Sequence, residues 1–389
     1  MSYRGGTYRG IQLASEFDKR GYLDKLFIPY YSQKHPYLTK LFGRFEDKQV
    51  VNPNKVMTNL WFPLLRRFMF YTRRFRNVRA NDRFFLGGML DKWVAARLDG
   101  NPDLLLVESH IALNTIKKAK ELGIVTFLDR QAAQIEFQVK IWREEGMDHY
   151  IDHRDVKNGL EEYKEADYII VPSSFVKNTF ENTSISMDKI MLVSPGIDLR
   201  YFNINKIYKK DSTFRIIYCG GIYLVKGVRY LLEAFNDLKL KDTELWLIGN
   251  VGSDMQYILK KYEGQYKLLS FIANYELYKY YTQGSVLVLP SLQDSFGKVV
   301  IEAMACGLPV IVSENTGAKD VVRNGIDGFV VPIRDVETLK EKILYMYENP
   351  DVCRQMGQNA KERVNKDFTL DAYANRMINV FRSILNRKN

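Results

Sequence analysis

The amino-acid sequence predicts an α/β protein made of two doubly wound domains. The chain has 389 residues, which is too long for one ordinary hydrophobic core and fits two domains of about 150–200 residues each. Short apolar runs alternate with helix-length segments along the whole chain, as is typical of parallel sheets covered by helices on both faces. A polar stretch at 203–213, NINKIYKKDST, lies between the two halves and indicates a linker or a solvated turn.

The apolar runs predict the strands one by one. In the first half of the chain they fall at 26–29, 104–107, 125–128, 169–172 and 191–194. In the second half they fall at 215–219, 244–248, 268–271, 286–290, 309–312 and 329–331. Helix-length segments such as 227–238 and 335–347 lie between these runs, so each strand is expected to cross over to a parallel neighbour.

One strand is expected to be absent from its usual place. A doubly wound domain usually begins with a buried strand that leads into a glycine turn, but here Gly5 and Gly6 follow only four residues. We therefore expect the first N-terminal strand to be missing, or the sheet to be rebuilt around a shorter edge.

The composition excludes several classes of protein. Hydrophobic residues make up 46% of the chain and charged residues 26%, and no stretch approaches the ~18 uncharged apolar residues of a membrane span. The N-terminus has no apolar region of the kind found in signal peptides. The three cysteines, Cys219, Cys306 and Cys353, are too far apart for a disulfide framework or a CxxC metal site. We therefore expect a protein of the reducing cytoplasm, without structural zinc.

The positive charge is concentrated in one region. The net charge is +11, and residues 1–100 hold 19 Lys and Arg against 8 Asp and Glu, while the remaining residues hold 38 of each sign. Such a basic field can face phosphates, anionic lipid or nucleic acid. No known nucleic-acid-binding motif is present, which argues against the last of these.

The basic segment 61–79, WFPLLRRFMFYTRRFRNVR, allows two interpretations. If it is helical, Arg66 and Arg73 share a face, as do Arg67 and Arg74, and apolar side chains line another face. That pattern is typical of an amphipathic helix lying on anionic lipid, and it indicates a peripheral contact with a membrane. The alternative is a helix that packs on the core with a solvated basic face.

The segment 290–332, PSLQDSFGKVVIEAMACGLPVIVSENTGAKDVVRNGIDGFVVP, carries the most chemical information. It predicts a strand end, a loop with Asp294, and a helix over 297–306. The loop residues 295–297 leave backbone N–H groups free at the start of that helix, which suits an anion such as a diphosphate. Glu302 lies within the helix, where its carboxylate can accept hydrogen bonds from two vicinal hydroxyls. The alternative is a strand–helix unit with surface carboxylates.

These residues resemble the retaining glycosyltransferases of family 4 (group 1). The signature of that family is two acidic residues eight apart, followed by EAMACGLPVI and later by NGxxGFxVP. This chain matches it at 302–310 and again at 324–332. The resemblance implies the GT-B architecture, in which two Rossmann-like domains face each other across a cleft that holds the donor. It also implies that Glu302 holds the ribose of a nucleotide-sugar and that Asp294, where the family usually has Glu, addresses the transferred sugar.

The same resemblance extends to other loops of the donor site. The stretch 216–227 resembles the strand and loop that clamp the donor diphosphate, and its Lys226 would stabilise the charge that grows on the leaving group. Gly221 stands where the family commonly has Arg. The glycines near the N-terminus resemble a loop beside the donor phosphates. The resemblance thus implies donor contacts from Gly5, Gly6, Gly220, Gly221, Lys226, Ser295, Phe296, Gly297, Lys298 and Glu302.

Candidate residues on the acceptor side are fewer. The stretch 126–134, TFLDRQAAQ, resembles a subset of the family in which Asp-Arg opens a loop facing the cleft, so Asp129 and Arg130 are either cleft residues or a structural ion pair. His110 follows a predicted strand and can reach the cleft, since ligands gather at the carboxyl ends of parallel strands. The alternative for His110 is a hydrogen-bonded surface residue. The predicted catalytic residues are Asp294, Lys226, His110 and Asp129.

The resemblance implies a retaining transfer of a sugar from a nucleoside diphosphate, UDP or GDP, to an acceptor. The acceptor would be a lipid-linked glycan, a polysaccharide or a protein, and no metal or other cofactor is expected. Residues 1–197, with a C-terminal helix over 370–389 packing back on them, would form the acceptor-side domain, and 198–369 the donor domain. The alternative function is a catalytically weak or silent homologue that acts as a partner subunit, which the Asp at 294 and the Gly at 221 would favour.

Overall fold

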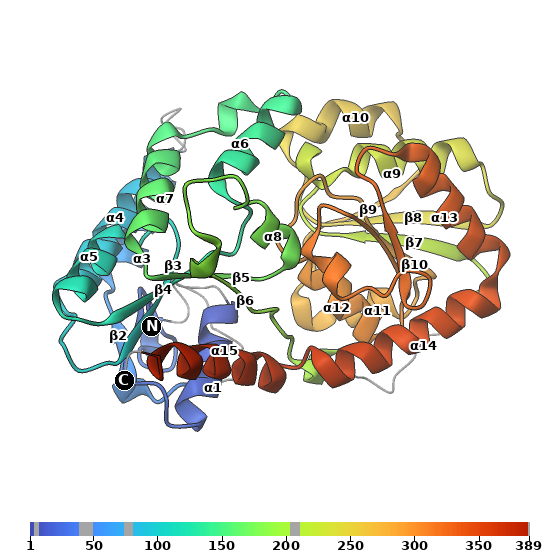
Figure 1. Cartoon of the computed structure of the whole chain (residues 1–389). Coiled ribbons are helices and arrows are strands. Elements are labelled where there is room, and N and C mark those ends of the chain that lie inside the picture. The colour runs from blue at the N-terminus through green and yellow to red at the C-terminus, as the bar shows by residue number, and fades with distance from the viewer. Residues whose placement is uncertain (4–7, 39–49, 74–80, 203–210, 388–389) are drawn as a thin grey trace.

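The computed structural model of the chain describes residues 1–3, 8–38, 50–73, 81–202 and 211–387, which form two α/β halves side by side (Figure 1). In each half, helices cover both faces of a parallel sheet. The predicted glycines Gly5 and Gly6 and most of the linker lie outside the described residues.

The N-terminal sheet has two parts. Strands β3 (Leu104–Glu108), β4 (Val125–Asp129), β5 (Tyr168–Val171) and β6 (Ile190–Leu192) run parallel in that order, and β1 (Leu26–Ile28) pairs in parallel with β2 (Val56–Thr58). The helices of this half are α1 (Tyr8–Lys19), α3 (Trp61–Arg73), α4 (Asn81–Ala95), α5 (Leu113–Glu121), α6 (Ile135–Glu144), α7 (His153–Glu165) and α8 (Ser174–Asn178).

Residues 1–3 join these two parts. The amide of Ser2 donates to the carbonyl of Leu106 (2.9 Å) and the amide of Glu108 donates to the carbonyl of Ser2 (3.0 Å). On the other side, the amide of Phe27 donates to the carbonyl of Met1 (2.8 Å). Ser2 thus pairs in parallel with β1 and with β3. The first strand, expected to be missing, is present between them but reduced to one paired residue, which is too short to show as an apolar run.

The C-terminal sheet has the strand order β12-β11-β10-β7-β8-β9 in the described residues, all parallel. Its strands are β7 (Phe214–Cys219), β8 (Thr243–Ile248), β9 (Lys267–Leu269), β10 (Val286–Leu289), β11 (Val310–Ser313) and β12 (Gly328–Val331). Its helices are α9 (Val228–Leu238), α10 (Gln256–Lys261), α11 (Tyr278–Tyr281), α12 (Lys298–Ala305), α13 (Val336–Glu348) and α14 (Pro350–Asp367). The order reverses between β7 and β10, so the loops after these two neighbouring strands diverge to opposite faces of the sheet.

The last helix, α15 (Leu370–Leu385), leaves the C-terminal half and lies against α1 of the N-terminal half (Figure 1). Its Phe381 packs edge to face with Phe17 and with Phe127, at ring-centroid distances of 5.9 and 4.8 Å. Where the chain crosses between the halves, the two crossings are bonded together: the amide of Ile197 donates to the carbonyl of Phe368 (2.9 Å). A Cβ at Gly196 would lie 2.1 Å from the carbonyl oxygen of Thr369, so this close approach requires glycine.

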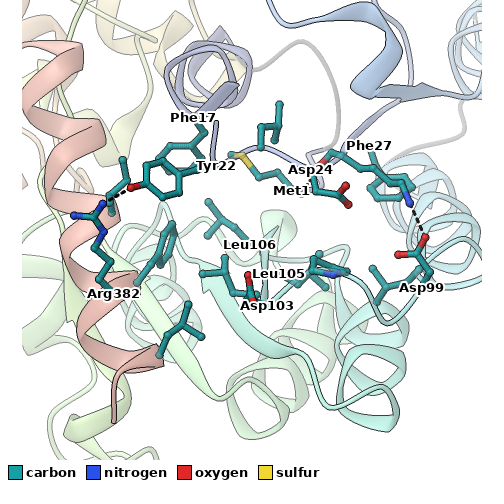
Figure 2. Close-up of a pocket in the computed structure, with 18 of the residues that line it drawn as sticks. Met1, Phe17, Tyr22, Asp24, Phe27, Asp99, Asp103, Leu105, Leu106 and Arg382 are labelled. Carbon is teal, nitrogen blue, oxygen red and sulfur yellow. Dashed lines mark hydrogen bonds and ion pairs between the residues drawn. The ribbon is translucent and has the colours of Figure 1, made fainter. Parts of the chain in front are cut away.

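A cavity of about 240 Å³ lies beside Met1, between the amino ends of β1 and β3 and helix α15 (Figure 2). Apolar side chains such as Phe17 and Leu106 line it, and two polar pairs border it, Arg382 with Tyr22 and Lys25 with Asp99. It faces away from the carboxyl ends of the strands. None of the helices in the described part of the chain combines the length and the apolar character needed to cross a bilayer.

Candidate functional site

The candidate site lies where the carboxyl ends of the two sheets meet. In open α/β sheets, ligands bind outside the carboxyl ends of the strands, at the point where the strand order reverses. In the C-terminal sheet this point lies between β7 and β10. The N-terminal half reaches it directly, because the Ser173 hydroxyl, after β5, donates to the carbonyl of Ser295, after β10 (2.7 Å).

Lys226 and Asp294 form an ion pair at this reversal point. The Nζ of Lys226 lies 2.5 Å from Oδ2 of Asp294, and Oδ1 of Asp294 accepts hydrogen bonds from the amides of Gly297 (2.8 Å) and Phe296 (3.3 Å). Burial alone would raise the pKa of Asp294, but the Lys226 ammonium and the two amides outweigh burial and lower that pKa below its ordinary value. The Asp294 carboxylate is therefore ionised at neutral pH.

The backbone brings these two loops together through Gly227. This residue follows Lys226, has φ = 65°, and is the N-cap residue of helix α9. A Cβ there would lie 2.0 Å from the carbonyl oxygen of Pro290, at the end of β10. Both the left-handed conformation and the close approach require glycine. The sequence pair Lys-Gly thus places a cation directly over the loop that carries Asp294.

Glu302 lies within helix α12, which follows the loop that carries Asp294. Its side chain is buried, at 5% exposed, so the alternative of a surface carboxylate is wrong for Glu302. Its Oε1 accepts a hydrogen bond from the side-chain amide of Asn274 (2.8 Å), and its Oε2 lies 3.5 Å from the hydroxyl of Tyr281. Burial raises the pKa of Glu302, while Asn274, Lys298 and Tyr281 oppose that rise. Asn274 and Tyr281 were not found from the sequence, because no motif marks them.

The remaining predicted donor residues that the structure describes lie along the same carboxyl edge of the C-terminal sheet. Gly220 directly follows β7, Ser295 and Gly297 flank Phe296, and Lys298 is the first residue of α12. The ring of Tyr223 fills the space beside Gly221: a Cβ at Gly221 would lie 2.4 Å from Cε2 of Tyr223. An aromatic ring thus occupies the space into which a side chain at position 221 would extend.

On the N-terminal side, Asp129 and Arg130 form hydrogen bonds with different partners. The hydroxyl of Tyr3 donates to Oδ2 of Asp129 (3.1 Å), and Gln131 donates to Oδ1. Arg130 is 0% exposed and donates to the carbonyl of Ala133 and to Nε2 of His110. His110 therefore lies next to the predicted Asp-Arg loop, at the carboxyl end of β3.

Ion pairs also join the two halves beside this edge. Arg334, after β12, contacts Glu144 (2.8 Å) and Glu145 (2.9 Å) at the end of α6, and Arg229 of α9 lies 3.0 Å from Glu145. The amide of Ser174 donates to Asp320 (2.6 Å). In the described ranges, no group of three or more His, Cys, Asp or Glu side chains is arranged to hold a metal ion.

The C-terminal half of the chain is similar in sequence to known proteins. Residues 200–363 match the family described as Glycosyl transferases group 1. The capsular polysaccharide biosynthesis glycosyltransferase CapM of Staphylococcus aureus is 29% identical over 222 residues, which cover 52% of this chain and 57% of that protein. The D-inositol 3-phosphate glycosyltransferase of Pseudarthrobacter chlorophenolicus is 25% identical over 210 residues, which cover 48% and 50%. The chain thus spans about half the length of the curated relatives it matches.

Solved structures match the chain over nearly its whole length. A sucrose-phosphate synthase from Thermosynechococcus elongatus has a TM-score of 0.72 at 19% identity and covers 97% of this chain and 92% of its own. The Anabaena protein HepE, in complex with UDP and glucose, has a TM-score of 0.67 at 15% identity, with 98% of each chain covered. These neighbours have two Rossmann-like domains, so the fold is GT-B, as the sequence motifs predicted.

Replacing Asp294 by asparagine tests how much the ion pair stabilises the site. We expect Asp294→Asn to lower the free energy of unfolding at pH 7 by about 1.5–3 kcal/mol, because charged hydrogen bonds to Lys226 and Gly297 are lost. Since the folded protein lowers the pKa of Asp294, this contribution is present at neutral pH and disappears as the pH falls through that lowered pKa. Urea unfolding of both proteins should therefore converge at acidic pH.

The matched control for this measurement is Glu263→Gln, which changes an exposed carboxylate of the same half. It should leave the free energy of unfolding within about 0.5 kcal/mol of the wild type. An Asp294→Asn protein as stable as the wild type at pH 7 would show that the pair does not stabilise the folded chain.

Proposed function

We propose that this chain, whose residues 200–363 match the family described as Glycosyl transferases group 1, transfers a sugar from a nucleoside diphosphate to an acceptor hydroxyl with retention of the anomeric configuration. One observation carries the proposal. Lys226, Asp294, the amides at the start of α12 and Glu302 lie along one edge, at the reversal point of the sheet. A cation and the amides that now donate to Asp294 suit a diphosphate, and a carboxylate further along suits the ribose hydroxyls.

The donor proposed first is a UDP-sugar. The structural neighbour HepE was solved with UDP and glucose and with UDP-glucose, which supports uridine diphosphate over the guanosine alternative. In this proposal the ribose hydroxyls donate to Glu302, which Asn274 and Tyr281 hold in place. The diphosphate lies between Lys226 and the amides after Asp294.

In the proposed mechanism the protein supplies charge and orientation. The glycosidic bond breaks as the diphosphate leaves, and Lys226 stabilises the negative charge that grows on the leaving oxygen. Asp294 orients the sugar through its hydroxyls, and the acceptor hydroxyl attacks from the face that the diphosphate leaves and passes its proton to the departing diphosphate oxygen. A lysine at the diphosphate can provide the positive charge that a divalent cation provides in other transferases, so we propose that no metal is required.

His110 and Asp129 are the proposed residues of the acceptor side. Arg130 is always protonated and donates to Nε2 of His110, so the proton of the neutral imidazole is on Nδ1. Asp129 is 0% exposed and is held by Tyr3 and Gln131, which gives it a positioning role. The contact of Lys226 with Asp294 favours an active enzyme over the silent homologue.

The acceptor is proposed to be a glycan, and a lipid-linked one would lie at a membrane. The relative CapM is named for capsular polysaccharide biosynthesis, which supports a glycan. Helix α3 buries Phe62 but exposes Trp61, Leu64, Arg67 and Phe68. An apolar stripe beside a basic side chain suits contact with anionic lipid. The side chains of Arg66 and Arg73 and all of 74–79 lie outside the described parts.

The ribose contact is tested by Glu302→Gln. We expect the variant to bind UDP about 10- to 150-fold more weakly, because charged hydrogen bonds worth about 1.5–3 kcal/mol are replaced by neutral ones. Isothermal titration calorimetry measures the change, and circular dichroism checks the fold. Glu233→Gln, an exposed carboxylate on α9, is the control and should bind UDP normally. Unchanged affinity in folded Glu302→Gln would exclude the ribose role.

The mechanism is tested by the stereochemistry of the product. Transfer from an α-linked UDP-sugar should proceed in EDTA and give an α-linked product, as read from the anomeric coupling constant by NMR. The physical reason is that Lys226 stands in for a metal and that attack and departure share one face. A β-linked product, or transfer that needs added Mg²⁺ or Mn²⁺, would contradict the mechanism.

The membrane contact is tested by changing Arg66, Arg67, Arg73 and Arg74 to Gln. Each cation near an anionic surface contributes about 1 kcal/mol, so loss of four should weaken partitioning onto anionic vesicles roughly a thousandfold. Vesicle sedimentation at low salt measures it, and UDP affinity should be unchanged. Wild-type protein that ignores anionic vesicles would show that the helix only packs on the core.

A further inference from the structure

A buried carboxylate that the proposed mechanism does not use lies beneath His110. Glu162 of α7 is 0% exposed. Its Oε2 accepts a hydrogen bond from the backbone amide of His110 (2.6 Å), and its Oε1 accepts one from the amide of Ala112 (2.9 Å). Asn158, one turn earlier on α7, also donates to Oε1 (3.3 Å). Glu162 thus holds both ends of a three-residue turn.

The turn that Glu162 holds has a strained backbone. His110 has φ = 73°, in the left-handed region that residues other than glycine rarely occupy. Such a conformation persists only where the surroundings impose it. Here the two amides on either side of Ile111 converge on a single carboxylate, which belongs to a different element of the fold.

The His110 ring is fixed by the same helix and by Arg130. Arg130 donates to Nε2 of the ring, as described above. Gly159 lies one turn before Glu162 on α7, and a Cβ at Gly159 would lie 3.8 Å from Cε1 of His110. The ring therefore packs directly on the surface of α7. The backbone of His110 is thus held by α7, and its ring is held by α7 and by Arg130.

We propose that Glu162 is a positioning residue for the transfer reaction, which orients His110 at the acceptor side by accepting the amides of His110 and Ala112. The inference rests on the transferase function proposed above. Glu162 touches neither donor nor acceptor. It acts through the strained turn after β3, which places the imidazole at the carboxyl end of the N-terminal sheet.

The charges around Glu162 make this arrangement sensitive to pH. Burial raises the pKa of Glu162 to about 7, against the opposing amides of His110 and Ala112. Asp91 of α4 raises that pKa further, and Arg130, after β4, lowers it. On α7 itself, Tyr163 is adjacent and has a pKa raised to about 12, so it stays neutral. As the pH falls through about 7 the Glu162 carboxyl gains a proton, and its O–H oxygen becomes a weaker acceptor for the backbone amides, so the turn is held less firmly.

The first test is the kinetics of Glu162→Gln in the full chain. Its side-chain NH₂ cannot accept an amide, so we expect kcat for transfer at pH 8 to fall at least tenfold. The donor KM should stay within twofold, because Glu162 contacts none of Lys226, Asp294 and Glu302, which lie in the other half. The wild type should lose kcat on the acid side with a midpoint near pH 7, and the variant should show no such step. Glu161→Gln makes the same change at the preceding residue and is the matched control.

The second test reads the position of His110 without activity. The chain has four histidines, so the His110 ring signals in a ¹³C-histidine NMR spectrum are identified by their loss in His110→Gln. We expect them to shift in Glu162→Gln and to remain in place in Glu161→Gln. Glu162→Asp keeps the charge but is one methylene shorter, and it should restore part of kcat.

The outcomes separate the two claims. The positioning role is overturned if Glu162→Gln keeps full kcat and leaves the His110 signals in place. It is also overturned if both Glu162→Gln and Glu162→Asp keep full kcat. A wild type that transfers sugar from no UDP- or GDP-sugar overturns the proposed function instead. In that case shifted His110 signals still support the structural link between Glu162 and His110, and unmoved signals overturn it.

Discussion

The candidate site depends on the contact between the loops after β7 and β10. These strands are neighbours in the sheet although two others separate them in the sequence, so their connections leave toward opposite faces, as at the ligand-binding edge of other open α/β sheets. Gly227 brings the first loop against Pro290, and the Lys226–Asp294 pair joins the two loops. The amides at the start of α12 are oriented by the same carboxylate. The Asp294 carboxylate thus contacts both the Lys226 ammonium and the backbone amides at the start of α12.

The N-terminal half is arranged by a similar device. A buried carboxylate, Glu162, organises the turn after β3, as Asp294 organises the loop after β10. The two halves are held edge to edge by the paired crossings at Ile197 and Phe368, and by contacts from Ser173 and Arg334. In both halves a buried or half-buried carboxylate thus fixes a loop by accepting backbone amides.

Much of the fold could be predicted from the sequence, and the reasons are physical. Buried parallel strands read as continuous apolar runs, so each predicted strand agrees with an observed one within two residues. Strand β2 was missed because it is three residues long, and the first strand because only Ser2 is paired. The motif residues Lys226 and Asp294 were found because the family resemblance marks them, and the structure brings them into contact.

The partners of those residues could not be predicted. Asn274 and Tyr281 reach Glu302 from elements that carry no motif, and only the folded chain brings them together. Glu162 lies in a helix rich in charged residues, where a carboxylate normally faces solvent, so no pattern indicates that this one is buried. Long-range contacts of single polar side chains leave no periodic signal.

A crystal structure of the chain with UDP would show whether the reversal point of the C-terminal sheet binds the donor nucleotide. We expect the diphosphate within hydrogen-bond distance of Lys226 Nζ and of the amides of Phe296 or Gly297, with the ribose hydroxyls on Glu302. UDP bound elsewhere, with Lys226 and Asp294 still paired and no nucleotide beside them, would contradict this expectation.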